Sequence, residues 1–205
     1  MDAIMAQAMK EQSRNPMTTK ESVKQMLGTL ESNNNYNIMV GGKKKNLTDM
    51  TVGEVIKYQE GLKGNTAAGK YQIKVDTLKS MVYIPVANNE DGSVEYAKNK
   101  DGSLKLRNPT DFSPDTKFNE ATQEWAADVL LERRGWSDYQ SGQISREELA
   151  TNLSKEWASM PDPAKGQRNS HYAGDGTHDR ETKVSTDDVY RVLDVQQARS
   201  SRPIQ

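Results

Sequence analysis

"TLESNNNYNIMVGGKKKNLTDM", residues 29–50, decides the fold, because it carries the end of a helix directly into a hairpin. Apolar residues recur at helical spacing up to Leu30, and three asparagines then follow the periodic run. From Tyr36 the pattern alternates, and Gly41-Gly42 supplies a turn before "KKKNL" returns. We therefore expect a helix that ends at Glu31-Ser32, followed by a small β-hairpin.

Glu31 draws attention because it falls on the apolar face of the expected helix, four residues after Leu27 and eight after Val23. A carboxyl group held against apolar neighbours loses hydration, which raises its pKa, and the negative end of the helix dipole acts in the same direction. A raised pKa suits a general acid at neutral pH. The alternative is an ordinary helix-end glutamate, and the helix alone leaves both interpretations open.

The rest of the chain is mostly helical by its periodicity. Helices should begin at three capping boxes, in which Ser or Thr precedes Glu by three residues. In the helix that contains Trp125, the spacing of Ala121, Trp125 and Val129 predicts one buried face. Trp125 and Trp157 are therefore expected in the core, and not as platforms for sugar. The expected helical segments are 18–31, 51–60, 70–82, 118–135, 145–161 and 185–198.

Residues 83–110 differ from their surroundings. They contain two Asp-Gly steps, at 91–92 and 101–102, and short alternating runs flank the second step. This pattern predicts a polar β-hairpin inserted at the surface. The order of helix, small hairpin and further helices indicates an α+β fold dominated by helices.

Composition removes several classes of function. The 205 residues have a net charge of -1, which gives no electrostatic case for binding nucleic acid or an anionic membrane. There is no cysteine, so disulfides and thiolate chemistry are excluded. The histidines are His171 and His178, without an HExxH motif, so we expect neither a metal site nor a cofactor. No apolar run is long enough to span a membrane, and the N-terminus does not have the pattern of a signal peptide.

Six short segments together resemble the lambda-endolysin family of lysozyme-like phage muramidases, which are lytic transglycosylases. They occur in the family's order and cover roughly residues 20–175. Each segment alone is weak, but a glutamate before a Gly-Gly hairpin, a GKYQ step and then W-A-S-x-P is fairly specific as a set. The segments are "LESNNNYNIMVGG" (30–42), "LTD" (47–49), "AAGKYQI" (67–73), "DFSP" (111–114), "LERRG" (131–135) and "WASMP" (157–161).

The resemblance implies a lysozyme-like fold with the small hairpin at its cleft. It also implies a substrate, the glycan strand of peptidoglycan, cut between N-acetylmuramic acid and N-acetylglucosamine. Glu31 matches the family's catalytic glutamate, and Lys70, Tyr71 and Gln72 match the segment that lines the sugar cleft. Ser32 and Asn37 either bind sugar N-acetyl groups or cap backbone, and Tyr172 is a further candidate for the cleft.

The choice between hydrolysis and transglycosylation depends on a second carboxylate. Hydrolysis of a glycosidic bond usually uses two carboxyl groups. Asp49 is the nearby candidate in sequence, although a turn or helix-start residue is the favoured interpretation of it. A transglycosylase needs only Glu31, because the 6-hydroxyl of muramic acid replaces water as the nucleophile.

We expect three regions: a polar N-terminal extension at 1–17, a lysozyme-like catalytic domain at 18–175, and a polar tail at 176–205 with a short helix. Residues 1–17 and 185–199 are expected to dock onto other virion proteins. The expected setting is a phage virion, in its tail, whose enzyme opens the host cell wall from the periplasm at entry. The alternatives are an endolysin for host lysis, a structural virion protein with an inactive lysozyme fold, and a module that binds glycan without cutting it.

Overall fold

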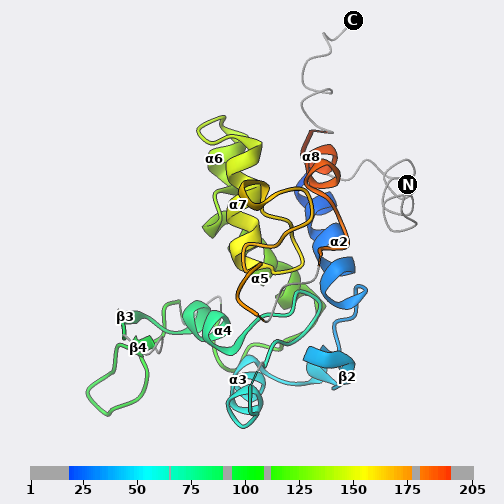
Figure 1. Ribbon diagram of the computed structural model, residues 1–205. Coiled ribbons are helices and arrows are strands. Elements are labelled where there is room, and N and C mark those ends of the chain that lie inside the picture. The colour runs from blue at the N-terminus through cyan, green and yellow to red at the C-terminus, as the bar shows by residue number, and fades with distance from the viewer. Residues whose placement is uncertain (1–18, 65, 90–93, 109–111, 177–180, 195–205) are drawn as a thin grey trace, which may run out of the picture. The chain divides into compact units, whose positions relative to one another are not determined.

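The computed structural model describes residues 19–64, 66–89, 94–108, 112–176 and 181–194 (Figure 1). The described residues contain seven α-helices and two small antiparallel sheets, which confirms the α+β class. They form two compact units. The first unit comprises the residues up to Asn34 and from Ala127 onward, and the second comprises Asn35–Ala126.

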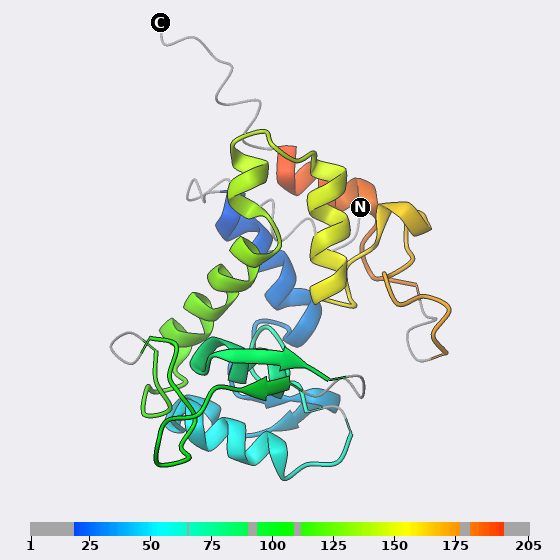
Figure 2. The same cartoon turned by 90° about the vertical axis from the view of Figure 1, so that its left-hand side faces the viewer.

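Helices build the first unit. It contains α2 (Thr19–Ser32), α6 (Trp136–Gln140), α7 (Arg146–Glu156), α8 (Thr186–Asp194) and the last part of α5 (Glu120–Arg133). The short 3-10 helix η3 (Pro163–Lys165) follows α7. Figures 1 and 2 show α8 against α2 and α7, and the three helices share one apolar core. This core includes Val23, Leu27, Leu149, Leu153, Val189 and Leu193.

Helix α2 ends at Ser32, as predicted, and two asparagines end it. Asn33 and Asn34 adopt the left-handed conformation, with φ of 54° and 60°. Asparagine tolerates this region better than other non-glycine residues. Their N–H groups donate to the carbonyls of Thr29, at 3.1 Å, and Gly28, at 2.8 Å. The chain therefore leaves the helix immediately after Glu31 and Ser32.

The second unit begins with the predicted small hairpin. Strands β1 (Ile38–Met39) and β2 (Lys43–Lys44) pair antiparallel, with Ile38 opposite Lys44. Between them η1 (Val40–Gly42) turns the chain, and Gly41 and Gly42 have φ of 74° and 78°. Positive φ at both positions explains the glycine pair.

Two helices follow the hairpin within the second unit, after the short 3-10 helix η2 (Leu47–Asp49). Helix α3 (Val52–Glu60) begins at a reciprocal capping box between Thr51 and Glu54, which confirms the prediction. Helix α4 (Val75–Val82) packs against α3. No helix in the described ranges is both long and apolar enough to cross a membrane.

The predicted insertion is a β-hairpin structure. Strands β3 (Pro85–Asn88) and β4 (Val94–Tyr96) pair antiparallel, and the Asp-Gly step at 91–92 lies outside the described residues. The second step forms a turn with Gly102 at φ 85°, closed by an isolated bridge between Lys98 and Leu104. Polar side chains cover most of this segment, as expected.

The predicted buried face of α5 is wrong. Trp125 is 40% exposed, and its ring stacks on the buried ring of Phe112 with centroids 4.4 Å apart. The residue that replaces it in the core is Gln123, which is fully buried. Its side-chain amide bonds three backbone groups, so a polar residue is stable at a core position. Trp157 is 3% exposed, which confirms its predicted place in the core.

Helix α8 has the apolar face that its sequence predicts. Val189, Val192 and Leu193 are buried, and the helix packs on α2 and α7 of the same chain. This face is therefore not free for docking onto another protein. Residues 1–17, the other predicted docking segment, lie outside the described residues, as does Thr18 of the first predicted capping box.

Candidate active site

Glu31 lies in the last turn of α2 and is half-buried. The hydroxyl of Ser159 donates a hydrogen bond to Oε1 of Glu31 at 2.5 Å, although 128 residues separate the two in sequence. Both residues belong to the first unit. Ser159 lies within the "WASMP" segment, but no sequence pattern assigns it a role of its own, because a pairing over such a distance leaves no local pattern.

Two further candidates of the first unit bond backbone groups. The hydroxyl of Ser32 donates to the carbonyl of Gly28 at 3.2 Å, and Ser32 is buried. The hydroxyl of Tyr172 donates to the carbonyl of Lys155 at 2.6 Å, and its ring meets that of His171 edge to face. For Ser32 this contact matches the capping alternative, and a contact of either residue with sugar stays a prediction.

The buried carboxylate of Asp162, three residues after Ser159, was not predicted from the sequence. Asp162 is 2% exposed and accepts hydrogen bonds from Thr151 Oγ1 at 3.2 Å and from the N–H of Ala164 at 3.0 Å. Nδ1 of His171 lies 2.9 Å from its other oxygen. Burial opposes ionisation of Asp162, but the hydrogen bonds from His171, Ala164 and Thr151 outweigh it and lower the pKa of the carboxyl group.

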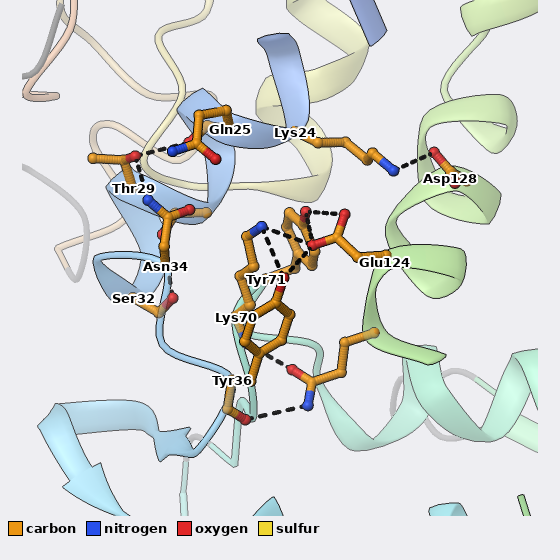
Figure 3. Close-up of polar contacts among 12 residues, drawn as sticks. Lys24, Gln25, Thr29, Ser32, Asn34, Tyr36, Lys70, Tyr71, Glu124 and Asp128 are labelled. Atoms are coloured by element: carbon orange, nitrogen blue, oxygen red, sulfur yellow. Dashed lines mark hydrogen bonds and ion pairs between the residues drawn. The ribbon is translucent and has the colours of Figure 1, made fainter. Parts of the chain in front are cut away.

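The second unit contains a polar cluster around Glu124. Lys70 Nζ lies 2.7 Å from Glu124 Oε1, the hydroxyl of Tyr36 donates to the same oxygen at 2.8 Å, and the hydroxyl of Tyr71 lies 2.8 Å from Oε2. Figure 3 shows the three donors converging on this carboxylate. We call these four residues the Glu124 cluster. The sequence pointed to Lys70 and Tyr71 but not to Glu124, since one glutamate among several on a helix carries no signal.

The Glu124 cluster is electrostatically fixed. Burial opposes ionisation of Glu124, yet the hydrogen bonds from Lys70, Tyr36 and Tyr71 lower its pKa to about 2. Burial and the hydrogen bond to Glu124 raise the pKa of Tyr36. Glu124 is therefore a carboxylate at every pH at which the protein is expected to work, and the tyrosines are its donors.

The GKYQ segment is held to α5 by its backbone as well. Lys70 is 7% exposed and Tyr71 is 1% exposed, so the side chains of both are largely inside the second unit. The N–H of Lys70 donates to Oε1 of Gln123 at 2.9 Å. Gly69 has φ of 75°, and a Cβ there would lie 2.2 Å from the same Oε1 of Gln123. Glycine is thus required for this close approach.

Gln72, Asn37 and Asp49 occupy more exposed positions. Gln72 is half-buried, with φ of 47°, and its Nε2 donates to the carbonyl of Gly69 at 2.9 Å. Oδ1 of Asn37 accepts from the N–H of Thr48 at 2.9 Å, so Asn37 also makes a backbone contact of the capping kind. Asp49 is exposed at the end of η2, which agrees with the turn interpretation.

Backbone conformation singles out the same segments. Among the described residues, the non-glycine positions with positive φ are Asn33, Asn34 and Gln72. Two of them directly follow Glu31-Ser32, and the third lies in the GKYQ step. Unfavourable backbone conformations persist where the surrounding structure enforces them, and they concentrate at functional sites. This observation marks each of the two segments, taken by itself, as a candidate functional segment.

Comparison with known proteins assigns the chain to a protein family. The family model described as endolysin matches residues 17–175, which is more than half of the 205 residues. Searches among curated proteins and among solved structures found no match. In the described part of the chain, no three His, Asp or Glu side chains are grouped so that they could hold a metal ion. The chain belongs to the endolysin family, and it is a phage enzyme that degrades the peptidoglycan of the bacterial cell wall.

Proposed function

We propose that the protein is a lysozyme-like muramidase that cleaves the β-1,4 bond between N-acetylmuramic acid and N-acetylglucosamine, as a lytic transglycosylase. One observation carries this proposal: a half-buried glutamate, Glu31, lies in the last turn of helix α2 inside the matched region, and the hydroxyl group of Ser159 donates a hydrogen bond to its carboxyl group. A carboxyl group that is partly shielded from water and held in place suits a general acid.

The proposed reaction uses Glu31 twice. Its carboxyl group gives a proton to the glycosidic oxygen while the bond from that oxygen to C1 of the muramic acid breaks. N-acetylglucosamine leaves with a free 4-hydroxyl group, and positive charge develops at C1. The 6-hydroxyl group of the same muramic acid then bonds to C1 and gives its proton to the Glu31 carboxylate. The products are a 1,6-anhydro end and a regenerated acid, and no water is consumed.

The candidates for a second carboxylate favour this route over hydrolysis. Asp49 is exposed at the end of the short 3-10 helix η2, so water surrounds most of its carboxyl group. Glu124 has a pKa of about 2 and accepts hydrogen bonds from Lys70 and two tyrosines, so it is a weak base and a poor nucleophile. A mechanism that needs one carboxyl group fits these side chains better.

Among the substrate-binding candidates we propose a division of labour. Gln72, Asn37 and Tyr172 are half-buried, so each has surface left for a sugar. Lys70 and Tyr71 are nearly enclosed and bond Glu124, so we assign them to shaping the wall that carries Gln72. Exchange of Gln72 should then raise KM, whereas exchange of Tyr71 should lower stability.

Product analysis tests the transglycosylase proposal. Purified peptidoglycan is digested to completion, and the soluble fragments are identified by mass spectrometry with and without prior borohydride reduction. The proposal expects fragments that are lighter by one water molecule than hydrolysis products and that resist reduction. Fragments with reducible ends would make the enzyme a hydrolase and return attention to Asp49.

The setting is a separate question, because a virion enzyme and a lysis enzyme perform the same chemistry. Sequence patterning favours virion docking through 1–17 and 185–199. The buried apolar face of α8 favours the second candidate, an endolysin that acts in host lysis, because it removes one docking surface. Quantitative mass spectrometry of gradient-purified virions separates them: a fixed number of copies per virion supports docking, and absence from virions but abundance in late lysates supports host lysis.

A further inference from the structure

We infer that Ser159 is the positioning residue for Glu31, and that the turn at residues 157–160 exists to present its hydroxyl group. The inference rests on the proposed role of Glu31. The contact is short, at 2.5 Å, within the range of O–H donors to carboxylates. A hydroxyl group can donate to a carboxylate and accept from a carboxyl group. Ser159 can therefore bond Glu31 both before and after proton transfer.

The contrast with Glu124 supports this assignment. There the donors include the ammonium group of Lys70, a cation that has no acceptor to offer and that favours the charged carboxylate. The Glu124 cluster therefore fixes one protonation state. The hydroxyl group of Ser159 is neutral and can either donate or accept, which is compatible with a carboxyl group that must lose and regain a proton in each turnover.

The turn that carries Ser159 is rigid on both sides. The N–H of Met160 donates to the carbonyl of Trp157 at 2.9 Å, and both of these side chains are buried. Pro161 is bridged to Ser170, and the N–H of Asp162 donates to the carbonyl of Asn169 at 2.7 Å. The half-buried Ser159 is thus held between enclosed neighbours.

Asp162 anchors the same turn to the rest of the first unit. Its carboxylate joins three separate parts of the chain: Thr151 of α7, Ala164 of η3, and His171. A shift of the turn would break these hydrogen bonds around a carboxylate that is almost fully enclosed, which is unfavourable.

Glu31 is fixed from its own side by the end of α2. The bonds from the N–H groups of Asn33 and Asn34 fix the backbone there, and Nδ2 of Asn34 donates to Oγ1 of Thr29 at 2.9 Å. Because the backbone is held on both sides, the Ser159–Glu31 bond has to order only the two side chains. It holds the carboxyl group in one orientation, and orientation of this kind contributes to rate rather than to binding.

The test compares Ser159→Ala, Ser159→Thr and a matched control, Ser137→Ala. Ser137 also donates to a glutamate of the first unit, Glu132, at 2.5 Å. On soluble peptidoglycan strands, Ser159→Ala should lower kcat by about 10- to 100-fold while KM changes by no more than about twofold. Ser159→Thr keeps a hydroxyl group and should recover most of the loss. Ser137→Ala should retain wild-type kcat.

Two results would overturn the inference. One is a kcat for Ser159→Ala within about twofold of wild type, since positioning of this kind is worth more. The other is an equal loss in Ser159→Thr accompanied by a lowered Tm, which would make Ser159 a packing residue only. If Glu31→Gln is inactive in the same assay, either result rejects the role of Ser159 and leaves the proposed function standing. An active Glu31→Gln would reject the proposed function itself.

Discussion

Lys70 and Glu124 form a 2.7 Å ion pair in which the lysine side chain is 9% exposed. Two tyrosine hydroxyl groups complete the coordination of the carboxylate, so the charges are compensated inside the second unit. A pair of this kind stabilises less than its Coulomb energy suggests, because both ions lose hydration. Removing one partner is a different matter, since it leaves the other charge enclosed without compensation.

Glu124→Gln should therefore destabilise the protein by about 2–3 kcal/mol, since it deprives Lys70 of its counter-ion and both tyrosines of a charged acceptor. Urea unfolding of wild type and variant measures the difference. Glu95→Gln, an exposed glutamate on β4, is the control and should change stability by less than about 0.5 kcal/mol. Equal stabilities of Glu124→Gln and wild type would show that the Glu124 cluster contributes nothing.

The same carboxylate predicts a dependence on pH. The pKa of Glu124 is lowered from 4.5 to about 2 in the folded state, so its stabilising contribution is complete above the unfolded value. It is lost as the pH falls from about 5 towards 2, because the unfolded chain takes up the proton first. The stability difference between wild type and Glu124→Gln should shrink over this range. Asp162 titrates in both proteins, so its contribution cancels; a constant difference from pH 7 to pH 2 would contradict the account.

Trp125 should dominate the collisional quenching of fluorescence. Of the three tryptophans, Trp136 and Trp157 are buried, whereas Trp125 has an open face. Trp125→Phe keeps the stacking on Phe112 and should remove most of the acrylamide-accessible emission, at a loss of stability of about 1 kcal/mol or less. Trp157→Phe should leave that emission in place. Equal quenching of the two variants would contradict the exposed position of Trp125.

Local patterns predicted the local structure well. The end of α2 at Ser32, the turn at Gly41-Gly42 and the capping box at Thr51 each depend on a few adjacent residues. Periodicity predicted the wrong buried face for α5. Gln123 fills a core position because its side chain bonds backbone groups, whereas Trp125 lies outside the core. A hydrophobicity pattern cannot predict the burial of a polar side chain whose hydrogen-bond partners lie elsewhere in the chain.

In the candidate site, too, sequence patterns pointed to residues with local signals and missed residues whose partners are distant in sequence. Glu31 could be proposed as a site residue from its helix face together with the segments that resemble the lambda-endolysin family. Ser159, Asp162 and Glu124 were not, because each matters through partners that are distant in sequence: Glu31 for Ser159, Thr151 and His171 for Asp162, and Lys70 for Glu124. Such pairs arise only when the chain folds, so sequence pattern indicated which segments matter but not which side chains meet.

The role of Glu31 is tested most directly by release of soluble fragments from labelled peptidoglycan by wild type, Glu31→Gln and Glu132→Gln. Glu132 is a control with a serine partner of its own in the same unit. Co-sedimentation with insoluble peptidoglycan measures binding in parallel. The account predicts that Glu31→Gln binds and folds like wild type but loses about 10²- to 10⁴-fold in rate, while Glu132→Gln stays active. Substantial release by Glu31→Gln, or no release by wild type, would contradict it.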